Sequence, residues 1–301
     1  MSVPMTGHFL KVSDYEQDFL MDVLDRAIEL EREFHARLMS RPLKGKRIAL
    51  MFEDTGFRNR VAFELGIRLM GGEAVFVPGK PGENESPADI ARYLSNWFDA
   101  IVIRTPEISV IEEMADASEV PVINARTRHN HPCEILGDLA FVLSQRGDLN
   151  DLNDLKIVFV GEATNLCHSW FEAAAVLPIH VVQVCPPGYE VAADAYPRIR
   201  ISHDLEQELK DADVVYTDCW PTRRTAEETA RIDEAFAPYR ITAALLDLTP
   251  ANCLFLPCPP VTRGEEVSAD AMDSPKCRVY EAKEYLLHAQ NALLAALVWR
   301  E

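Results

Sequence analysis

The chain has 301 residues, of which 48% are hydrophobic, and no run reaches the about 18 apolar residues of a membrane helix, so we expect a globular protein of two domains. A formal net charge of −18 argues against nucleic acid and anionic membranes as partners. The chain has seven cysteines and no C-x-x-C pair, so we expect reduced thiols and no structural zinc. Residues 1–7 do not resemble a secretory signal, so we expect the protein in the cytoplasm.

The first half of the chain is predicted to alternate short apolar strands with helices, after one long amphipathic helix over residues 15–41. A strand, a loop and a helix start together occupy residues 46–71. Further strands are expected over 72–78, 100–104 and 120–124, and further helices over 88–96 and 133–145. Strands that are apolar on both faces and separated by helices are typical of a parallel sheet covered on both sides.

The same pattern restarts after a polar, turn-rich junction at residues 147–154. Strands are expected over 156–160, 180–184, 214–217, 244–248 and 253–256, followed by a closing helix over about 281–300. We therefore predict an α/β fold with two doubly wound parallel-sheet domains. The domains would be residues 1–147, with the helix 281–301 packed back on them, and residues 148–280. Ligands would bind in a cleft between the domains, at the carboxyl ends of the strands.

Basic side chains fall where strands of the first half end. Arg58 and Arg60 follow the first strand, Arg104 ends the third, and His131 lies just beyond the fourth. The carboxyl ends of parallel strands share one edge, so these side chains would converge there. Arginines beside a helix N-terminus suit a phosphate, and a histidine can donate to a carbonyl oxygen that gains charge. The pattern predicts a site for a phosphorylated substrate with a carbonyl group, although one arginine at a strand end is more often part of a surface ion pair.

Six ordered segments resemble the ornithine/aspartate carbamoyltransferase family, nearer its ornithine branch, over nearly the whole chain. They are residues 52–64, 103–105, 131–134, 161–169, 217–220 and 257–267. The first matches the family's phosphate loop, F-E-x-x-S-T-R-T-R-x-S-F-E, and the third matches its H-P-C-Q. The resemblance implies that an amine attacks the carbonyl carbon of carbamoyl phosphate, that a tetrahedral intermediate forms and that phosphate leaves. It also implies a homotrimer with shared active sites.

Matching positions give each candidate residue an implied role. The carbamoyl-phosphate site would comprise Gly56, Phe57, Arg58, Asn59, Arg104, His131 and Glu134. The amine acceptor would be contacted by Asn165, Asp218, Thr222, Arg223 and Cys258. Arg104, His131 and Cys258 would be the catalytic residues, with Cys258 beside the attacking amine. The sequence contains neither a metal-ligand cluster nor a dinucleotide fingerprint, so no metal ion and no cofactor are predicted.

The chain departs from the family in the residues that would hold both substrates. Gly56, Phe57 and Asn59 replace one serine and two threonines, and the family's C-terminal arginine has no counterpart at its matching site. Glu134 replaces a glutamine, and its carboxylate would accept from the carbamoyl NH₂, pair with an arginine, or take a proton from the incoming ammonium. The loss of hydroxyl donors predicts weaker phosphate binding unless another contact compensates.

The acceptor loop points away from ornithine itself. Residues 222–224, Thr-Arg-Arg, replace the family's S-M-G, and the two added cations favour an acceptor that bears an additional acid, unless they are only a solvated pair. Two other hypotheses stay open. The chain could be a non-catalytic paralogue that binds phosphate or an amino acid in a regulatory role, or an enzyme of the same fold that uses a different acyl phosphate.

Overall fold

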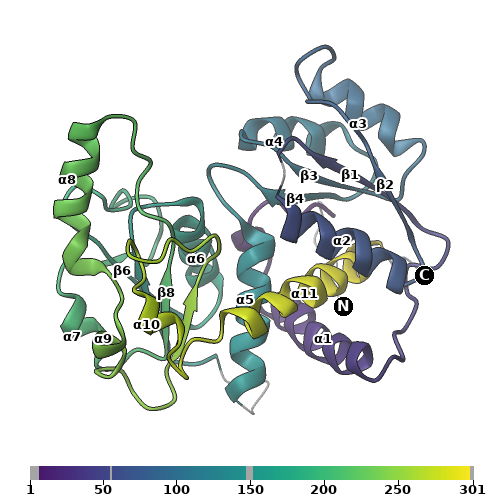
Figure 1. Cartoon of the computed structure of the whole chain (residues 1–301). Helices are drawn as coiled ribbons and strands as arrows, with labels where there is room; N and C mark the ends of the chain where they lie inside the picture. The colour runs from purple at the N-terminus through teal and green to yellow at the C-terminus, as the bar shows by residue number, and fades with distance from the viewer. Residues whose placement is uncertain (1–6, 55, 147–151, 299–301) are drawn as a thin grey trace. The chain divides into compact units, whose positions relative to one another are not determined.

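The computed structural model describes residues 7–54, 56–146 and 152–298 of the chain (Figure 1). The chain divides into two compact units, Met1–Asp151 with Ala282–Glu301, and Leu152–Glu281. Residues 147–151 of the predicted junction, and the end of the predicted closing helix at 299–300, lie outside the described residues. Each unit holds one parallel sheet, which confirms the predicted α/β fold with two doubly wound sheets.

Unit 1 is built on a four-stranded parallel sheet in the order β2-β1-β3-β4. Its strands are β1 (Arg47–Phe52), β2 (Glu73–Phe76), β3 (Ala100–Arg104) and β4 (Val122–Arg126). The central strands β1 and β3 are buried on both faces for most of their length, which explains their unbroken apolar sequence. The chain leaves β1 toward β2 on one side and continues from β3 to β4 on the other. The sheet therefore has a topological switch point between β1 and β3, where ligands of such folds bind.

Helices cover both faces of this sheet. Figure 1 shows α3 (Pro87–Ser95) and α4 (Ile108–Ala117) on one side, and α1 (Gln17–His35), α2 (Phe57–Leu69) and α11 (Val279–Val298) on the other. Alternate strand residues Ala49, Met51, Ile101 and Ile103 pack with the apolar faces of α3 and α4. The helix α5 (Pro132–Arg146) follows β4 and contacts α1, and a short 3₁₀ turn, η1 (Val12–Asp14), precedes α1.

Unit 2 contains a five-stranded parallel sheet in the order β7-β6-β5-β8-β9. The strands are β5 (Leu155–Val160), β6 (Ile179–Val184), β7 (Arg200–Ser202), β8 (Val214–Thr217) and β9 (Leu254–Pro257). The helices are α6 (Asn165–Val176), α7 (Leu205–Leu209), α8 (Ala226–Phe236), α9 (Ala243–Leu246) and α10 (Ala269–Met272), with a 3₁₀ turn η2 (Ala237–Tyr239) after α8. Val158 and Val160 face the core formed with α7, α9 and α10, while Phe159 stacks on Tyr216. The switch point of this sheet lies between β5 and β8.

One predicted strand is wrong, and one predicted helix is too long. Residues 244–248 were expected to form a strand, but Ala243–Leu246 is a short helix whose N-cap Thr242 accepts a hydrogen bond from the Leu245 amide. A run of five residues, of which four are apolar, carries no periodicity that separates a strand from a buried helix, and the Thr242 cap favours the helix. The first helix ends at His35 rather than at 41, because Arg37 adopts a left-handed φ of 60°.

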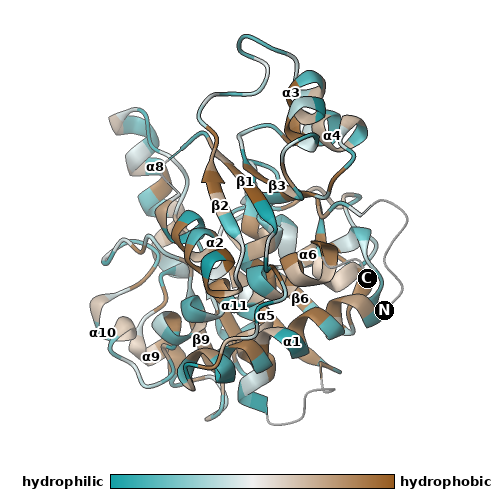
Figure 2. Ribbon diagram, turned by 90° about the vertical axis from the view of Figure 1, so that its right-hand side faces the viewer, coloured by the Kyte–Doolittle hydropathy of each residue, from teal (hydrophilic) through white to brown (hydrophobic). Residues whose placement is uncertain are grey.

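Hydrophobic residues follow the strands and the long helix α11, as the brown segments of Figure 2 show. Polar residues alternate with them along the helices that face outward within each unit, which is the amphipathic pattern of globular helices. Of the helices in residues 7–54, 56–146 and 152–298, none combines the length and apolar character that a membrane span requires.

Candidate functional site

The two arginines nearest the switch point of unit 1 lie side by side at the carboxyl edge of its sheet. Phe52, the last residue of β1, pairs in register with Arg104 of β3, and Arg104 pairs with Arg126 of β4 across a local irregularity. The loop that follows β1 leads directly into α2, so a helix N-terminus opens at the same edge. This edge therefore combines guanidinium groups with the N-terminus of a helix, as suits an anion site.

An acidic residue of this loop binds both arginines. Asp54 Oδ1 lies 2.5 Å from Arg104 Nε, and Asp54 Oδ2 lies 3.2 Å from Arg104 Nη2 and 3.5 Å from Arg126 Nη1. The Arg104 side chain is 14% exposed and that of Asp54 is 50% exposed. Neither Asp54 nor Arg126 is among the residues predicted from the sequence to form the site. The signals for them were an acidic side chain inside a phosphate loop and a second arginine at a strand end.

Gly56 makes room for Arg104. A Cβ atom built on Gly56 would lie 2.6 Å from Arg104 Nε and 2.7 Å from its Cζ, and Gly56 has a φ of 20° at the N-cap of α2. The guanidinium that pairs with Asp54 thus rests against the glycine, where the related family has a serine. A side chain at position 56 would displace Arg104 in this conformation.

The next four residues of the predicted phosphate loop, 57–60, differ in their orientation. Phe57 is 62% exposed, and the Arg58 guanidinium lies 4.8 Å from the centre of its ring. Asn59 is buried, and its amide nitrogen donates to the Ala125 carbonyl 3.5 Å away. Arg60 stacks over Phe76 at 4.0 Å, toward β2. The charge of Arg58 helps to lower the pKa of Glu134, although less than Lys283 and His131 do.

His131 and Glu134 lie at the start of α5, just beyond β4. His131 Nε2 is 3.4 Å from Glu134 Oε2, and Glu134 Oε1 is 2.8 Å from Lys283 Nζ of α11. Burial lowers the pKa of His131 to about 3, so its imidazole is neutral at pH 7. Burial acts to raise the pKa of Glu134, but the Lys283 ammonium, followed by His131, brings it below its usual range. The pairing of Lys283 with Glu134 was not predicted, because nothing in the sequence brings residues 149 positions apart together.

In unit 2, three predicted acceptor residues lie at the carboxyl edge of the sheet. Thr217 of β8 pairs in register with Pro257 of β9, and the Cys258 amide donates to the Thr217 carbonyl at 2.8 Å. Asp218 and Cys258, which follow these two residues, are therefore neighbours. Asn165 is the first residue of α6, which begins shortly after β5. The three residues surround the switch point between β5 and β8.

This edge of unit 2 carries an excess of carboxylates. Burial and the charge of Asp218 raise the pKa of Glu162. Burial raises the pKa of Glu266 as well, and Glu265 and Asp218 add to the effect. Such mutual repulsion favours a positively charged group among them. Within the described residues, however, no group of three or more His, Cys, Asp or Glu side chains is arranged to hold a metal ion.

The predicted acceptor residue Arg223 is neutralised within its own unit. Its Nη1 lies 2.7 Å from Glu265 Oε1, its Nη2 lies 2.9 Å from Asp233 Oδ1, and its guanidinium lies 5.6 Å from the centre of the Trp220 ring. Thr222 is exposed. The expectation that Arg223 supplies a cation for an additional acid on the acceptor therefore loses its basis, because two carboxylates already balance its charge.

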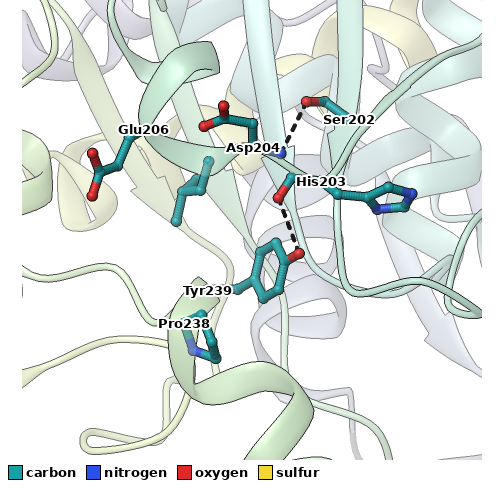
Figure 3. Close-up of a pocket in the computed structure, with 7 residues that line it drawn as sticks. Ser202, His203, Asp204, Glu206, Pro238 and Tyr239 are labelled. Carbon is teal, nitrogen blue, oxygen red and sulfur yellow. Dashed lines mark hydrogen bonds between the residues drawn. The ribbon is translucent and has the colours of Figure 1, made fainter.

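A surface hollow of unit 2 lies elsewhere (Figure 3). It is lined by Ser202, His203, Asp204, Leu205, Glu206, Pro238 and Tyr239. The Tyr239 hydroxyl donates to the His203 carbonyl at 3.1 Å, and Asp204 caps the short helix α7. The hollow opens beside the edge strand β7 and includes none of the predicted site residues. Its polar groups serve local structure, so we do not assign it to the candidate site.

Comparisons with known proteins agree with the two-unit organisation. Residues 7–144 match the family described as aspartate/ornithine carbamoyltransferase, carbamoyl-P binding domain, and residues 153–297 match its Asp/Orn binding domain. The chain is 38% identical to an ornithine carbamoyltransferase of Chlorobaculum tepidum over 304 residues, which cover 96% of this chain and 89% of the relative.

Solved structures share this fold over nearly the whole chain. An ornithine carbamoyltransferase from Pyrococcus furiosus superposes with a TM-score of 0.88 at 32% identity, covering 96% of each chain. An N-acetyl-L-ornithine transcarbamylase superposes with a TM-score of 0.84 at 27% identity, covering 96% of this chain and 99% of that one. Chains named for different acceptors therefore resemble this one.

Proposed function

Because this chain belongs to the aspartate/ornithine carbamoyltransferase family, whose members are transferases, we propose that it transfers a carbamoyl group from carbamoyl phosphate to the amine of an amino-acid-like acceptor. Unit 1 would bind the donor and unit 2 would supply the acceptor-binding residues. The observation that carries the proposal is the convergence of Arg104, neutral His131 and Glu134 near a helix N-terminus in the unit matched to carbamoyl-phosphate binding.

Several groups of the donor site would each contact a different part of carbamoyl phosphate. The amides at the start of α2, with Arg58 and Arg104, would neutralise the phosphate. A neutral imidazole has one N–H, and we assign it to His131 Nε2, the nitrogen that faces Glu134. This N–H and Arg104 would donate to the carbonyl oxygen. Glu134 would accept from the carbamoyl NH₂.

Catalysis would then consist of positioning and charge stabilisation. The amine lone pair attacks the carbonyl carbon, the amine loses a proton as the C–N bond forms, and the carbonyl oxygen becomes negative. Arg104 and His131 bind that oxygen more tightly as its charge grows, which lowers the barrier. The C–O bond to phosphate then breaks, and the phosphate takes up the proton released by the amine. It leaves as the dianion HPO₄²⁻, which the arginines stabilise. No covalent intermediate with the protein is needed.

The carboxylates of unit 2 support an acceptor that enters with an ammonium group. Asp218 and Glu162 attract a cation, and Asn165 and Cys258 lie beside them for the amino-acid end and the attacking amine. We propose that the acceptor differs from ornithine itself. The loop at 222–224 differs from the family's S-M-G, which supports this proposal, while the neutralisation of Arg223 removes the reason to require a second acid.

We further propose a homotrimer in the cytoplasm. Phe57, Val61 and Leu65 recur at helical spacing on α2 and are 62%, 54% and 42% exposed, as expected of a face covered by another copy. All seven cysteines are free thiols, which suits a reducing compartment. Light scattering of the wild type and of Val61→Asp tests the assembly, because a trimer held by this face should lose mass in the variant.

A screen of amines tests the function. Ornithine, other diamino acids and acidic diamines would each be mixed with carbamoyl phosphate, and the ureido product measured. Arg104→Ala should lower kcat roughly 10²–10³-fold with the active amine, the usual cost of losing an oxyanion donor. Arg128→Ala, which removes an exposed arginine paired with Glu107 in the same unit, is the matched control and should change kcat less than about twofold. Intact phosphate binding with no product from any amine would favour the non-catalytic hypothesis.

A further inference from the structure

A lysine of the C-terminal helix reaches the donor residues because two helices of unit 1 meet at a glycine. A Cβ atom on Gly137 of α5 would lie 3.0 Å from both the N and the Cα of Leu286 on α11. The backbones of α5 and α11 therefore touch at this point. Lys283 precedes Leu286 by about one turn, and Glu134 precedes Gly137 by about one turn, so the close contact brings the two side chains together.

The lysine is held by two carboxylates away from water. Lys283 Nζ lies 2.8 Å from Glu134 Oε1, and it donates to Asp138 Oδ1 at 2.7 Å and to Oδ2 at 2.8 Å. The side chains of Lys283, Glu134 and Asp138 are 11%, 8% and 1% exposed. Such a buried ion pair is costly to break, because the partner that remains is an uncompensated buried charge.

Lys283 determines which oxygen of Glu134 remains available to a ligand. One Glu134 oxygen is taken by Lys283, and the other lies 3.4 Å from His131 Nε2. The charged and titratable groups that act on Glu134 come from three elements: Lys283 of α11, His131 at the start of α5, and Arg58 of α2. Burial alone would raise the pKa of Glu134, whereas Lys283 is the largest of the opposing influences.

We propose that Lys283 is a positioning residue of the donor site, which keeps Glu134 ionised and directs its second oxygen toward His131 and the donor. The proposal rests on the proposed function and extends it to the choice of donor. An ionised carboxylate can only accept hydrogen bonds. It therefore favours a donor that offers N–H groups, carbamoyl phosphate, over acetyl phosphate, which presents a methyl group at that place. A protonated Glu134 would lose this selectivity.

Lys283 thus compensates for the glutamate that stands at position 134 in place of the family's glutamine. A lone glutamate in this buried position would tend to bind a proton, and would then offer a hydroxyl donor to an NH₂ group. Lys283 removes that outcome. Of the roles that the sequence leaves open for Glu134, the proposal therefore favours a fixed acceptor over the base that deprotonates the amine.

The test compares Lys283→Met, Lys283→Arg, Glu134→Gln and the double variant Lys283→Met/Glu134→Gln. Lys283→Met should raise the KM for carbamoyl phosphate roughly tenfold at pH 6 and reduce discrimination against acetyl phosphate, with partial recovery at high pH as Glu134 ionises. Lys283→Arg should recover most of the loss. The double variant should lose the added pH dependence, because position 134 no longer titrates.

Lys156→Met is the matched control, because Lys156 is a buried lysine of unit 2, also 11% exposed, that pairs with Glu208 and Asp211. It should lower stability without changing the pH profile or the donor preference. If Lys283→Met changed kcat and KM no more than Lys156→Met does, at every pH, the positioning role would be refuted.

A second readout separates this proposal from the proposed function. Infrared difference spectra between Lys283→Met and the double variant report the protonated carboxyl group of Glu134 without any turnover. A carboxyl band that appears as the pH falls through the neutral range, and is absent when the wild type is compared with Glu134→Gln, supports the proposal even if no amine is carbamoylated. The absence of that band in Lys283→Met would overturn it. Should Lys283→Met not fold, Lys283→Arg and Glu134→Gln decide by donor preference: the first should keep it and the second should weaken it.

Discussion

Asp54 should weaken the binding of phosphate groups to unit 1, because it already binds the two arginines that an anion would use. Its carboxylate lies within 3.5 Å of both Arg104 and Arg126. Two unit charges about 4 Å apart interact by about 1 kcal/mol in water. The Asp54 side chain is half exposed, so this value applies better than that of a buried pair. Asp54→Asn should therefore strengthen the binding of a phosphate group by roughly 1–2 kcal/mol.

This gain in binding free energy corresponds to a roughly 5- to 30-fold lower Kd for inorganic phosphate and for carbamoyl phosphate. Isothermal titration calorimetry at low salt measures it directly, and added salt should shrink the difference. Glu107→Gln is the matched control, since Glu107 is an exposed carboxylate that pairs with Arg128 outside the site. An unchanged or higher Kd in Asp54→Asn would refute the view that Asp54 competes with the ligand's phosphate.

Three further outcomes follow from contacts within the units. Gly137→Ala should lower the free energy of unfolding by roughly 1–3 kcal/mol in denaturant titrations, because its Cβ would crowd the Leu286 backbone; an unchanged value would contradict the close helix contact. Cys258→Ala should lower kcat without altering phosphate affinity, as measured by kinetics and calorimetry; a lost phosphate affinity would place Cys258 elsewhere. The Lys283 ammonium lowers the folded-state pKa of Glu134 to about 2, so their pair stabilises the fold fully above the unfolded value of about 4.3. This effect is lost as the pH falls through the folded-state pKa, so thermal melts of wild type and Glu134→Gln should converge toward pH 2.

Strong local patterns made much of the fold predictable. The run over residues 100–103 is short, wholly apolar and buried, and with Arg104 at its end it forms β3. The helix expected over 88–96 forms as α3, with Pro87 at its first position and the Ser86 side chain capping its start. Residues 244–248 lacked any such signal. Their apolar character was compatible with a strand, and only the tertiary context and the Thr242 cap make them helical.

The candidate site was less predictable wherever it depends on long-range pairing. Arg104 could be placed at the carboxyl edge because strand ends in a parallel sheet share that edge. Nothing local, however, shows that Arg223 meets Glu265 and Asp233, because a turn and a separate helix bring those carboxylates to it. Lys283 likewise reaches Glu134 only through the packing of α11 on α5. Charge balance at a buried site is a property of the assembled fold.

Transfer of a labelled carbamoyl group tests the central claim most directly. Carbamoyl phosphate carrying ¹³C at the carbonyl carbon would be incubated with the wild-type protein and each amine, and followed by NMR. Carbamoyl transfer predicts that the label moves into the ureido carbon of one acceptor, with an equal amount of phosphate released, and that Arg104→Ala slows this transfer roughly 10²–10³-fold. If carbamoyl phosphate bound to the protein but decayed at its uncatalysed rate with every amine, including ornithine, the claim would be contradicted.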